Sequence, residues 1–332
     1  MMISSRQTLY SVLSLILTVT TVFAENGFWK AQESALPSST STINKSSNTR
    51  IQSINITGST TVSNVLNILA DRFEQNHNNI RINIVGGGSS SAVTAMLANT
   101  ENIGQMSREM KSKERNAFIK HYGYEPIEFK VAVDALAVYV NKKHPVKQLT
   151  SNQLADIFSM KSQHINTWGD LKLSQVNTMD WQKKVIQIYT LPKTSGAYSL
   201  FNKKVLKKAG YKVSSISQPT SSAVVQAVGV DSGGITFASS FFKTKRTHFL
   251  ALEGKDQKFY QPVQPWISSF QYPLSRYLYL YVNKKPGTAI SVKNKQFLRF
   301  LMANGTQTLI KRAGFYSVSK KIRQQQLELL EK

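Results

Sequence analysis

The sequence predicts an α/β protein with two domains, and three observations support this fold class. Segments with the two-residue period of strands alternate along the chain with segments of helical period. Residues 129–141 form a long run rich in β-branched side chains, as expected for a strand buried on both faces. The chain has 332 residues, more than a single hydrophobic core usually supports. Together these features predict two mostly parallel sheets flanked by helices, with hinge strands between them.

The first elements follow a strand–helix order from residue 51 onward. Residues 51–58 alternate apolar and polar side chains, which predicts a strand that ends at a glycine. Residues 61–75 carry apolar side chains at helical spacing. A second alternating strand over 80–86 ends in three glycines, and a second helix is expected over 92–97. The buried strand at 129–141 follows.

The second half of the chain continues the same alternation. A short helix is expected to begin after Thr150 or Ser151, either of which suits an N-cap. The remaining elements expected here are strands at 185–191 and 233–240, a turn and helix within 192–210, and a helix over 221–230.

Two long strands of similar character indicate how the domains connect. The segment 272–283 repeats the apolar and β-branched character of 131–141, which suggests that the chain crosses between the domains twice. The helices expected over 294–314 would then complete the first domain. We therefore predict a discontinuous domain 1 (51–133 plus 280–325) and an inserted domain 2 (136–275).

The N-terminal 50 residues are not expected to belong to the fold. Arg6, an apolar run over 9–23 and Ala24 form the pattern of a signal peptide, with cleavage after Ala24. An uncleaved membrane anchor stays open as the alternative. Residues 25–50 are rich in Ser, Thr and Asn and lack a hydrophobic period, which predicts a disordered linker. The protein is therefore expected in the periplasm or secreted.

The chain carries a strong positive charge. Its net charge is +24, and cleavage would remove only Arg6, leaving +23. Such a surplus steers anions toward the protein and keeps it soluble. Contact with lipid head groups, acidic envelope polymers or extracellular DNA stays open as a further use of the basic surface.

The sequence gives no support for catalysis or for a bound cofactor or metal. The absence of cysteine excludes disulfides, thiolate metal sites and a Cys nucleophile. No Gly-x-Ser-x-Gly motif is present, and the glycines at 86–88 are not followed by the Gly-Lys-Ser/Thr of a nucleotide P-loop. The five histidines lie far apart and lack metal-binding spacing: His77, His121, His144, His164 and His248.

The functional signal lies in three turns that join a strand to a helix. They are rich in glycine and hydroxyl side chains, and they span 58–61, 86–91 and 194–197. Helix N-termini offer unpaired backbone N–H groups and partial positive charge, which suits an oxyanion. In an open α/β sheet such turns gather at the carboxyl ends of the strands. Ordinary helix capping explains any one of them, but three such turns favour an anion site.

Five motifs resemble those of the periplasmic phosphate-binding proteins of phosphate ABC importers. They read ITGSTTV, GGGSSSAVTAMLANTENIG, MSREMKSKE, VAVDALAVYVNK and TSGAYSLF, and the likeness extends over 51–325. The resemblance implies a periplasmic-binding-protein fold of type II whose two lobes close on phosphate. It further implies delivery to an inner-membrane ABC permease, no chemistry, no cofactor and a monomer.

The resemblance also implies which residues contact phosphate. The matching positions supply hydroxyl groups, first-turn amides and a charged pair, and they are Thr60, Thr61, Val62, Ser89, Ser107, Arg108, Asp134, Ser195, Gly196 and Ala197. The chain departs from the family pattern in two places. Many relatives have an arginine just before the Ser-Gly-Thr turn, where this chain has Lys193, and the threonine of that turn is Ala197 here.

Two of these residues have structural as well as functional interpretations. Arg108 suits an oxyanion, but it also suits an ion pair with Glu109 or Glu114. Asp134 lies in an apolar run, where a carboxylate needs a partner. It is expected either to accept a proton of phosphate or to pair with a buried arginine or a backbone N–H. The altered turn around Lys193 and Ala197 is expected to weaken phosphate binding relative to the family. The alternative function is a secreted basic binding or adhesion module of the same fold, which binds polyanions or envelope components and has a weak role or none in phosphate uptake.

Overall fold

The computed structural model describes residues 51–99 and 102–331. The predicted signal peptide (1–24) and linker (25–50) lie outside these residues. None of the helices within the described ranges is both long enough and apolar enough to span a bilayer.

Three short parallel strands begin the fold. Strand β1 (Gln52–Gly58) lies between β2 (Ile80–Gly86) and β3 (Ile103–Met106) and is parallel to both. The helices that follow these strands are α1 (Thr60–Asn76), α2 (Ser89–Leu97) and α3 (Ser112–Tyr122). The carboxyl ends of β1 and β2 therefore lead directly into α1 and α2, as the sequence predicts.

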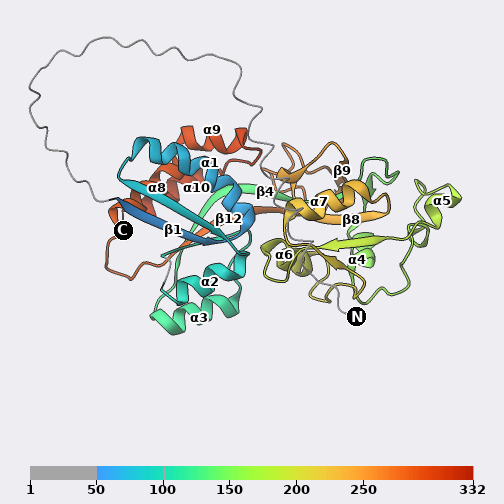
Figure 1. Cartoon of the computed structure of the whole chain (residues 1–332), viewed down its shortest axis with the longest axis horizontal. Helices are drawn as coiled ribbons and strands as arrows, with labels where there is room; N and C mark the ends of the chain where they lie inside the picture. The colour runs from blue at the N-terminus through green and yellow to red at the C-terminus, as the bar shows by residue number, and fades with distance from the viewer. Residues whose placement is uncertain (1–50, 100–101, 332) are drawn as a thin grey trace, which may run out of the picture. The chain divides into compact units, whose positions relative to one another are not determined.

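Two long strands run through the middle of the sheet. Strand β4 (Ile127–Asn141) pairs antiparallel with β12 (Ser275–Val282) over its first half. Its second half pairs antiparallel with β8 (Gly234–Ser239) and β9 (Thr247–Phe249). Strand β4 thus belongs to both groups of strands, and Figure 1 shows it passing from one to the other beside β12.

The second group of strands has its own parallel part. Strand β6 (Gln187–Thr190) is parallel to both β8 and β7 (Ile216–Ser217). A separate small sheet consists of β5 (Gln148–Leu149), β10 (Ala251–Glu253) and β11 (Phe259–Tyr260). The helices here are α4 (Ser151–Phe158), α5 (Met179–Gln182), α6 (Gly196–Lys204) and α7 (Ser221–Val230).

The last three helices return to the beginning of the fold. They are α8 (Val292–Met302), α9 (Asn304–Arg312) and α10 (Lys320–Leu329). Helices α8 and α9 contact α1, and α10 contacts α8. In Figure 1 these C-terminal helices, in red, lie beside the blue elements from the start of the described chain.

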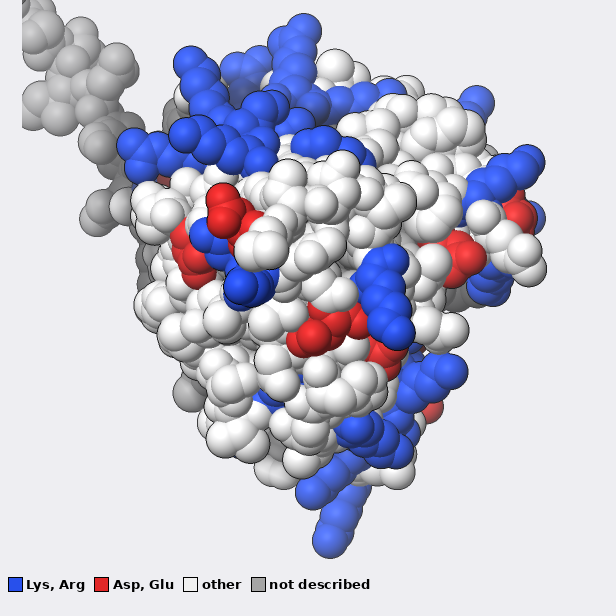
Figure 2. All heavy atoms as spheres, turned by 90° about the vertical axis from the view of Figure 1, so that its right-hand side faces the viewer, with Lys and Arg blue, Asp and Glu red and all other residues white. Residues whose placement is uncertain are grey.

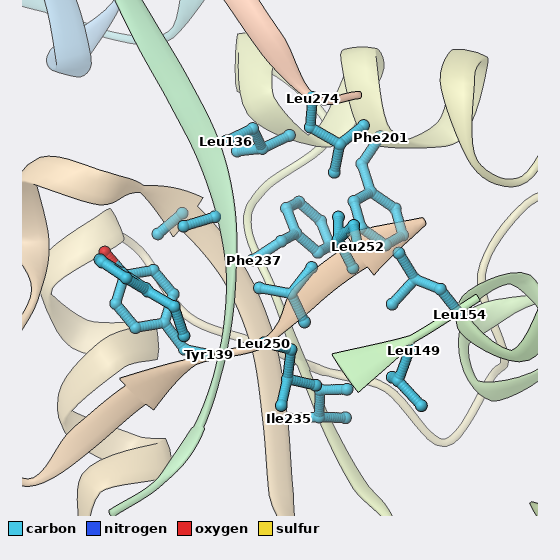
Figure 3. Close-up of a cluster of buried hydrophobic side chains, with 14 of the residues drawn as sticks. Leu136, Tyr139, Leu149, Leu154, Phe201, Ile235, Phe237, Leu250, Leu252 and Leu274 are labelled. Carbon is cyan, nitrogen blue, oxygen red and sulfur yellow. The ribbon is translucent and has the colours of Figure 1, made fainter. Parts of the chain in front are cut away.

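Buried hydrophobic side chains gather in three clusters. The largest takes its members from residues 133–274 and Val318. Ten of its side chains, from Leu136 to Leu274, are labelled in Figure 3, and they come from several elements, among them β4, β8 and α6. A second cluster takes its members from 54–132 and 278–330, and a third packs under α2 and α3. Burying this apolar area is the main stabilising contribution.

The predicted elements are present near their predicted positions, and the structure adds several others. Thr150 is the N-cap of α4: its side chain accepts from Gln153 N, and Gln153 Oε1 accepts from Thr150 N. The additions are β3, β5, β7, β9, β10, β11, α3, α5 and α10. Two mostly parallel sheets were predicted, whereas in the described chain the parallel strands lie at the two ends of one nine-stranded sheet. The antiparallel pairs β3–β12, β12–β4 and β4–β8 join these ends, because β4 and β12 cross between them in opposite directions.

Candidate functional site

Backbone hydrogen bonds hold together the turns that precede α1 and α2. The carbonyl oxygen of Gly58 accepts from the amides of Gly87 and Gly88, at 2.7 and 2.9 Å. Ser59 N donates to Gln105 O at 2.9 Å. The carboxyl ends of all three parallel strands therefore meet at one place.

The start of α6 lies against these turns, although it comes from the other group of strands. Ser90 N is 3.4 Å from Thr194 O. A Cβ added at Gly88 would lie 2.6 Å from the same oxygen, and Gly88 has a φ of 91°. A side chain at this position would therefore be strained and would push the two turns apart. The glycine permits the close approach.

Two buried serine hydroxyls meet the first residue of α6. Ser89 Oγ accepts from Ser107 N at 3.0 Å and lies 3.4 Å from Ser107 Oγ. A Cβ added at Gly196 would overlap both hydroxyl oxygens. Ser195 is the N-cap of α6, and its Oγ accepts from Ala197 N at 3.2 Å. The structure therefore brings Ser89, Ser107 and Gly196 into direct contact.

Three helix starts thus supply the backbone groups of this site. None of α1, α2 and α6 has an acidic residue in its first turn. Their partial positive charges are therefore not neutralised locally, and their first amides lack intrahelical partners. An anion is the ligand that such an arrangement stabilises.

The three residues expected to act at the first turn of α1 differ in how far their side chains are exposed. Thr60 is exposed, and its methyl group lies beside Gly86 of the neighbouring turn. Thr61 is buried, and Val62 belongs to a hydrophobic cluster. Val62 can therefore contact a ligand through its backbone N–H but not through its side chain.

Arg108 is buried beside the start of α2 and bonded to several neighbours. Only 4% of its surface is exposed, and its Nη1 and Nη2 atoms donate to the two carboxylate oxygens of Glu114, each at 2.7 Å. Nη2 also donates to Ser90 Oγ at 3.2 Å. Nε has no hydrogen-bond partner among the described residues. Arg108 thus forms the Glu114 ion pair while it lies next to the helix start.

Asp134 forms a buried ion pair with Arg276, which lies directly opposite it on β12. Asp134 Oδ2 accepts from Arg276 Nε and Nη2 at 2.9 and 2.7 Å, and Oδ1 accepts from Ser239 Oγ at 2.6 Å. Burial raises the pKa of Asp134, and Arg276 and Ser239 oppose this shift. Both carboxylate oxygens are therefore occupied by protein donors.

Arg276 is the residue that the sequence reasoning missed. The signal was that each of two similar apolar segments holds one charged residue, Asp134 within 131–141 and Arg276 within 272–283. Antiparallel pairing places these two residues opposite each other. Arg276 is 4% exposed, and its Nη1 has no partner in the described part of the chain. Across residues 51–99 and 102–331, no group of three His, Cys, Asp or Glu side chains could hold a metal.

Comparison with known proteins shows the family. A model described as the PBP superfamily domain matches residues 44–304. The chain is 35% identical over 279 residues to the phosphate-binding protein PstS of Pseudomonas aeruginosa, across 82% of this chain and 85% of that protein. The chain belongs to the PstS family of phosphate-binding proteins. It is also 27% identical over 275 residues to PstS of Staphylococcus epidermidis, across 82% of this chain and 80% of that protein.

Solved structures confirm the predicted periplasmic-binding-protein fold of type II. A Clostridium perfringens substrate-binding protein, assigned to phosphate ABC transport and crystallised with phosphate, matches with a TM-score of 0.69 and 22% identity. The match covers 81% of this chain and all of that one. An ABC-type phosphate transport receptor from Vibrio cholerae matches with a TM-score of 0.63 and 23% identity, over 79% of this chain and 99% of that one. Proteins of the PstS family bind and do not catalyse, as the sequence predicted.

Proposed function

We propose that the protein binds inorganic phosphate, or a related tetrahedral oxyanion, and delivers it to an ABC importer. The observation that carries this proposal is the meeting of three helix starts, with Gly196 of α6 against Ser89 and Ser107. Family membership supports phosphate as the ligand, since the relatives at 35% and 27% identity are named phosphate-binding proteins.

Each predicted residue has a proposed role in holding the anion. The hydroxyls of Thr60, Thr61, Ser89, Ser107 and Ser195 donate to its oxygens, and the backbone amides of Val62, Gly196 and Ala197 add first-turn donors. Arg108 offers guanidinium N–H groups beside the site, while Glu114 balances its charge. Asp134 acts indirectly, because its carboxylate holds Arg276 in place.

Calorimetric titration with phosphate, arsenate and sulfate tests this function. We expect heat on addition of phosphate and a weaker response to sulfate. Ser195→Ala should weaken phosphate binding about tenfold, since a hydrogen bond to a charged group contributes about 1.5–3 kcal/mol. Thr220→Ala is the matched control: Thr220 caps α7 with the same kind of hydroxyl contact. Equal affinities in the two variants would remove Ser195 from the site.

We further propose that the chain forms the two predicted lobes, 51–133 plus 280–325 and 136–275, which close on the anion. The two larger hydrophobic clusters support this division. Of their members, those before 133 and after 275 belong to one cluster and those between belong to the other, with Val318 as the exception. Among the described residues, β4 and β12 run from one group of residues to the other in the middle of the sheet. Binding energy would favour the closed state.

Export, a monomeric state and presentation to an inner-membrane permease complete the proposal. The N-terminal pattern described above supports cleavage after Ala24 and a periplasmic or secreted location. Mass spectrometry of the exported protein would test the cleavage site. Size-exclusion chromatography with light scattering would test the monomer.

The basic surface is proposed to make non-specific contacts with polyanions. Figure 2 shows lysine and arginine side chains gathered at the upper edge of one face. Near β9, Lys142 N donates to Arg246 O, which places two basic segments side by side. These segments, 142–147 and 243–246, hold six basic residues and no acidic one: Lys142, Lys143, Lys147, Lys243, Lys245 and Arg246. Retention on heparin that falls steeply with salt would support this contact.

A further inference from the structure

A large cavity lies between α6, β12 and the segment that follows β3. Its volume is about 850 Å³, within the range of about 300–1,000 Å³ that is typical of small-molecule sites. Its lining residues come from three parts of the chain: all of 108–112, several residues within 193–208, and several within 270–279. Of the ten residues proposed to hold phosphate, only Arg108 lines it. The cavity therefore lies beside the proposed phosphate site, shares Arg108 with it and is otherwise lined by different residues.

The cavity carries an excess of positive charge. Arg108 and Arg276 in its wall are neutralised by Glu114 and Asp134. Glu109 is the acidic residue among the lining side chains, and five lysines remain against it: Lys111, Lys193, Lys203, Lys204 and Lys208. Several negative charges on a ligand would be needed to balance them.

Burial and neighbouring arginines both disfavour the charged forms of two lysines in the wall. Burial and the neighbouring Arg276 lower the pKa of Lys204, whose Nζ donates to Pro273 O and Ser275 O at 3.1 and 3.3 Å. Burial and Arg108 lower the pKa of Lys111. The unpartnered Arg108 Nε and Arg276 Nη1 belong to buried side chains of the same wall. An anion beside these groups would stabilise their charged forms.

Aromatic rings form another part of the wall. Tyr198, Phe270, Tyr277 and Tyr279 line the cavity. Phe270 is 39% exposed and has a φ of 58°, an uncommon conformation for a bulky residue. Its ring lies 4.8 Å from that of Tyr277. Tyr279 is buried and Tyr198 and Tyr277 are half-buried, so Phe270 offers the most accessible ring. An accessible ring near lysines suits a ligand that combines a flat ring with phosphate groups.

We propose that this cavity binds a nucleoside diphosphate or triphosphate. The phosphate chain lies against the lysines at the end of α6, and the base lies against Phe270 and Tyr277. Inorganic phosphate offers neither the ring nor the several charges, so the two sites have different ligands. This inference does not depend on phosphate binding at the helix starts.

Titration of the purified protein with ADP tests the proposal, in the absence of divalent cations and with excess orthophosphate present. We expect ADP to bind under these conditions, and more tightly than either adenosine or pyrophosphate. A Lys203→Gln, Lys208→Gln double variant should bind ADP at least about tenfold more weakly, because it removes two charged contacts. Phe270→Ala should also weaken ADP binding. Neither variant should change the affinity for orthophosphate.

Lys207→Gln provides the matched control, since Lys207 is exposed beside Lys208 but does not line the cavity. Its ADP affinity should equal that of the unmodified chain. Three results would each overturn the proposal. They are a failure of ADP to bind at all, a failure of ADP to bind when orthophosphate is in excess, and binding of ADP that is no tighter than that of pyrophosphate. Loss of orthophosphate binding with ADP binding retained would instead contradict only the proposed function.

Discussion

Asp134 and Arg276 form an ion pair that is buried between the two central strands. Removing one partner leaves an uncompensated charge in the interior. We therefore expect Arg276→Met to lower the free energy of unfolding by about 3–5 kcal/mol, measured by urea denaturation. The Asp134→Leu, Arg276→Met double variant should recover most of this loss. If the Arg276→Met variant is as stable as the unmodified chain, the ion pair does not contribute to stability.

Gly196 is the residue at which α6 touches the two buried serines. A methyl group there would overlap Ser89 Oγ and Ser107 Oγ, so Gly196→Ala should separate the helix starts. We expect phosphate affinity to fall about tenfold or more, measured by calorimetry. The control is Gly305→Ala in α9, where an added Cβ meets nothing within 4 Å. That variant should keep its affinity and gain about 0.5–1 kcal/mol of stability.

The individual elements differ in how clearly the sequence predicts them. Helix α1 buries an apolar stripe, and β4 is buried along most of its length, so their patterns are readable. Helix α3 buries only Phe118 and α10 only Gln326, which leaves no apolar period to detect. Strands β5, β7 and β11 have two residues each, and tertiary pairing alone defines them.

Helix α4 offers a test of a feature that the sequence did predict. Its N-cap Thr150 and Gln153 bond reciprocally, and together they satisfy two backbone N–H groups. Thr150→Ala should lower the free energy of unfolding by about 1 kcal/mol in urea denaturation. Thr150→Ser keeps the hydroxyl and should lose much less. Equal losses in the two variants would mean that the hydroxyl does not stabilise the helix.

For the whole molecule, the candidate site was partly readable because its turns carry local signals. Glycines and hydroxyl residues mark the starts of α1, α2 and α6 within a few residues of sequence. The contact between Gly196 and Ser89 and the pairing of Arg276 with Asp134 join residues that are far apart in the chain. Local patterns cannot define such pairs, because strand register and domain packing determine them.

Stability should also depend on pH through His144. This ring is fully buried against Trp168 and Trp181, and burial lowers its pKa to about 3. In the unfolded chain the pKa is about 6.5, so the unfolded state takes up a proton first as the pH falls. The free energy of unfolding should therefore decrease between pH 6.5 and pH 3, by up to about 1.4 kcal/mol per pH unit from this group. Denaturation of His144→Phe should show a shallower decrease; an unchanged slope would exclude His144 as its source.

We propose above all that helix starts from both groups of strands hold one small oxyanion. Amide resonances of the labelled protein, recorded while phosphate is added, test it most directly. The amides of Ser89, Gly196 and Ala197 should shift together and reach saturation at one phosphate per chain. Shifts confined to the lysines at the end of α6, or resonances of these three amides that stay in place, would contradict the claim.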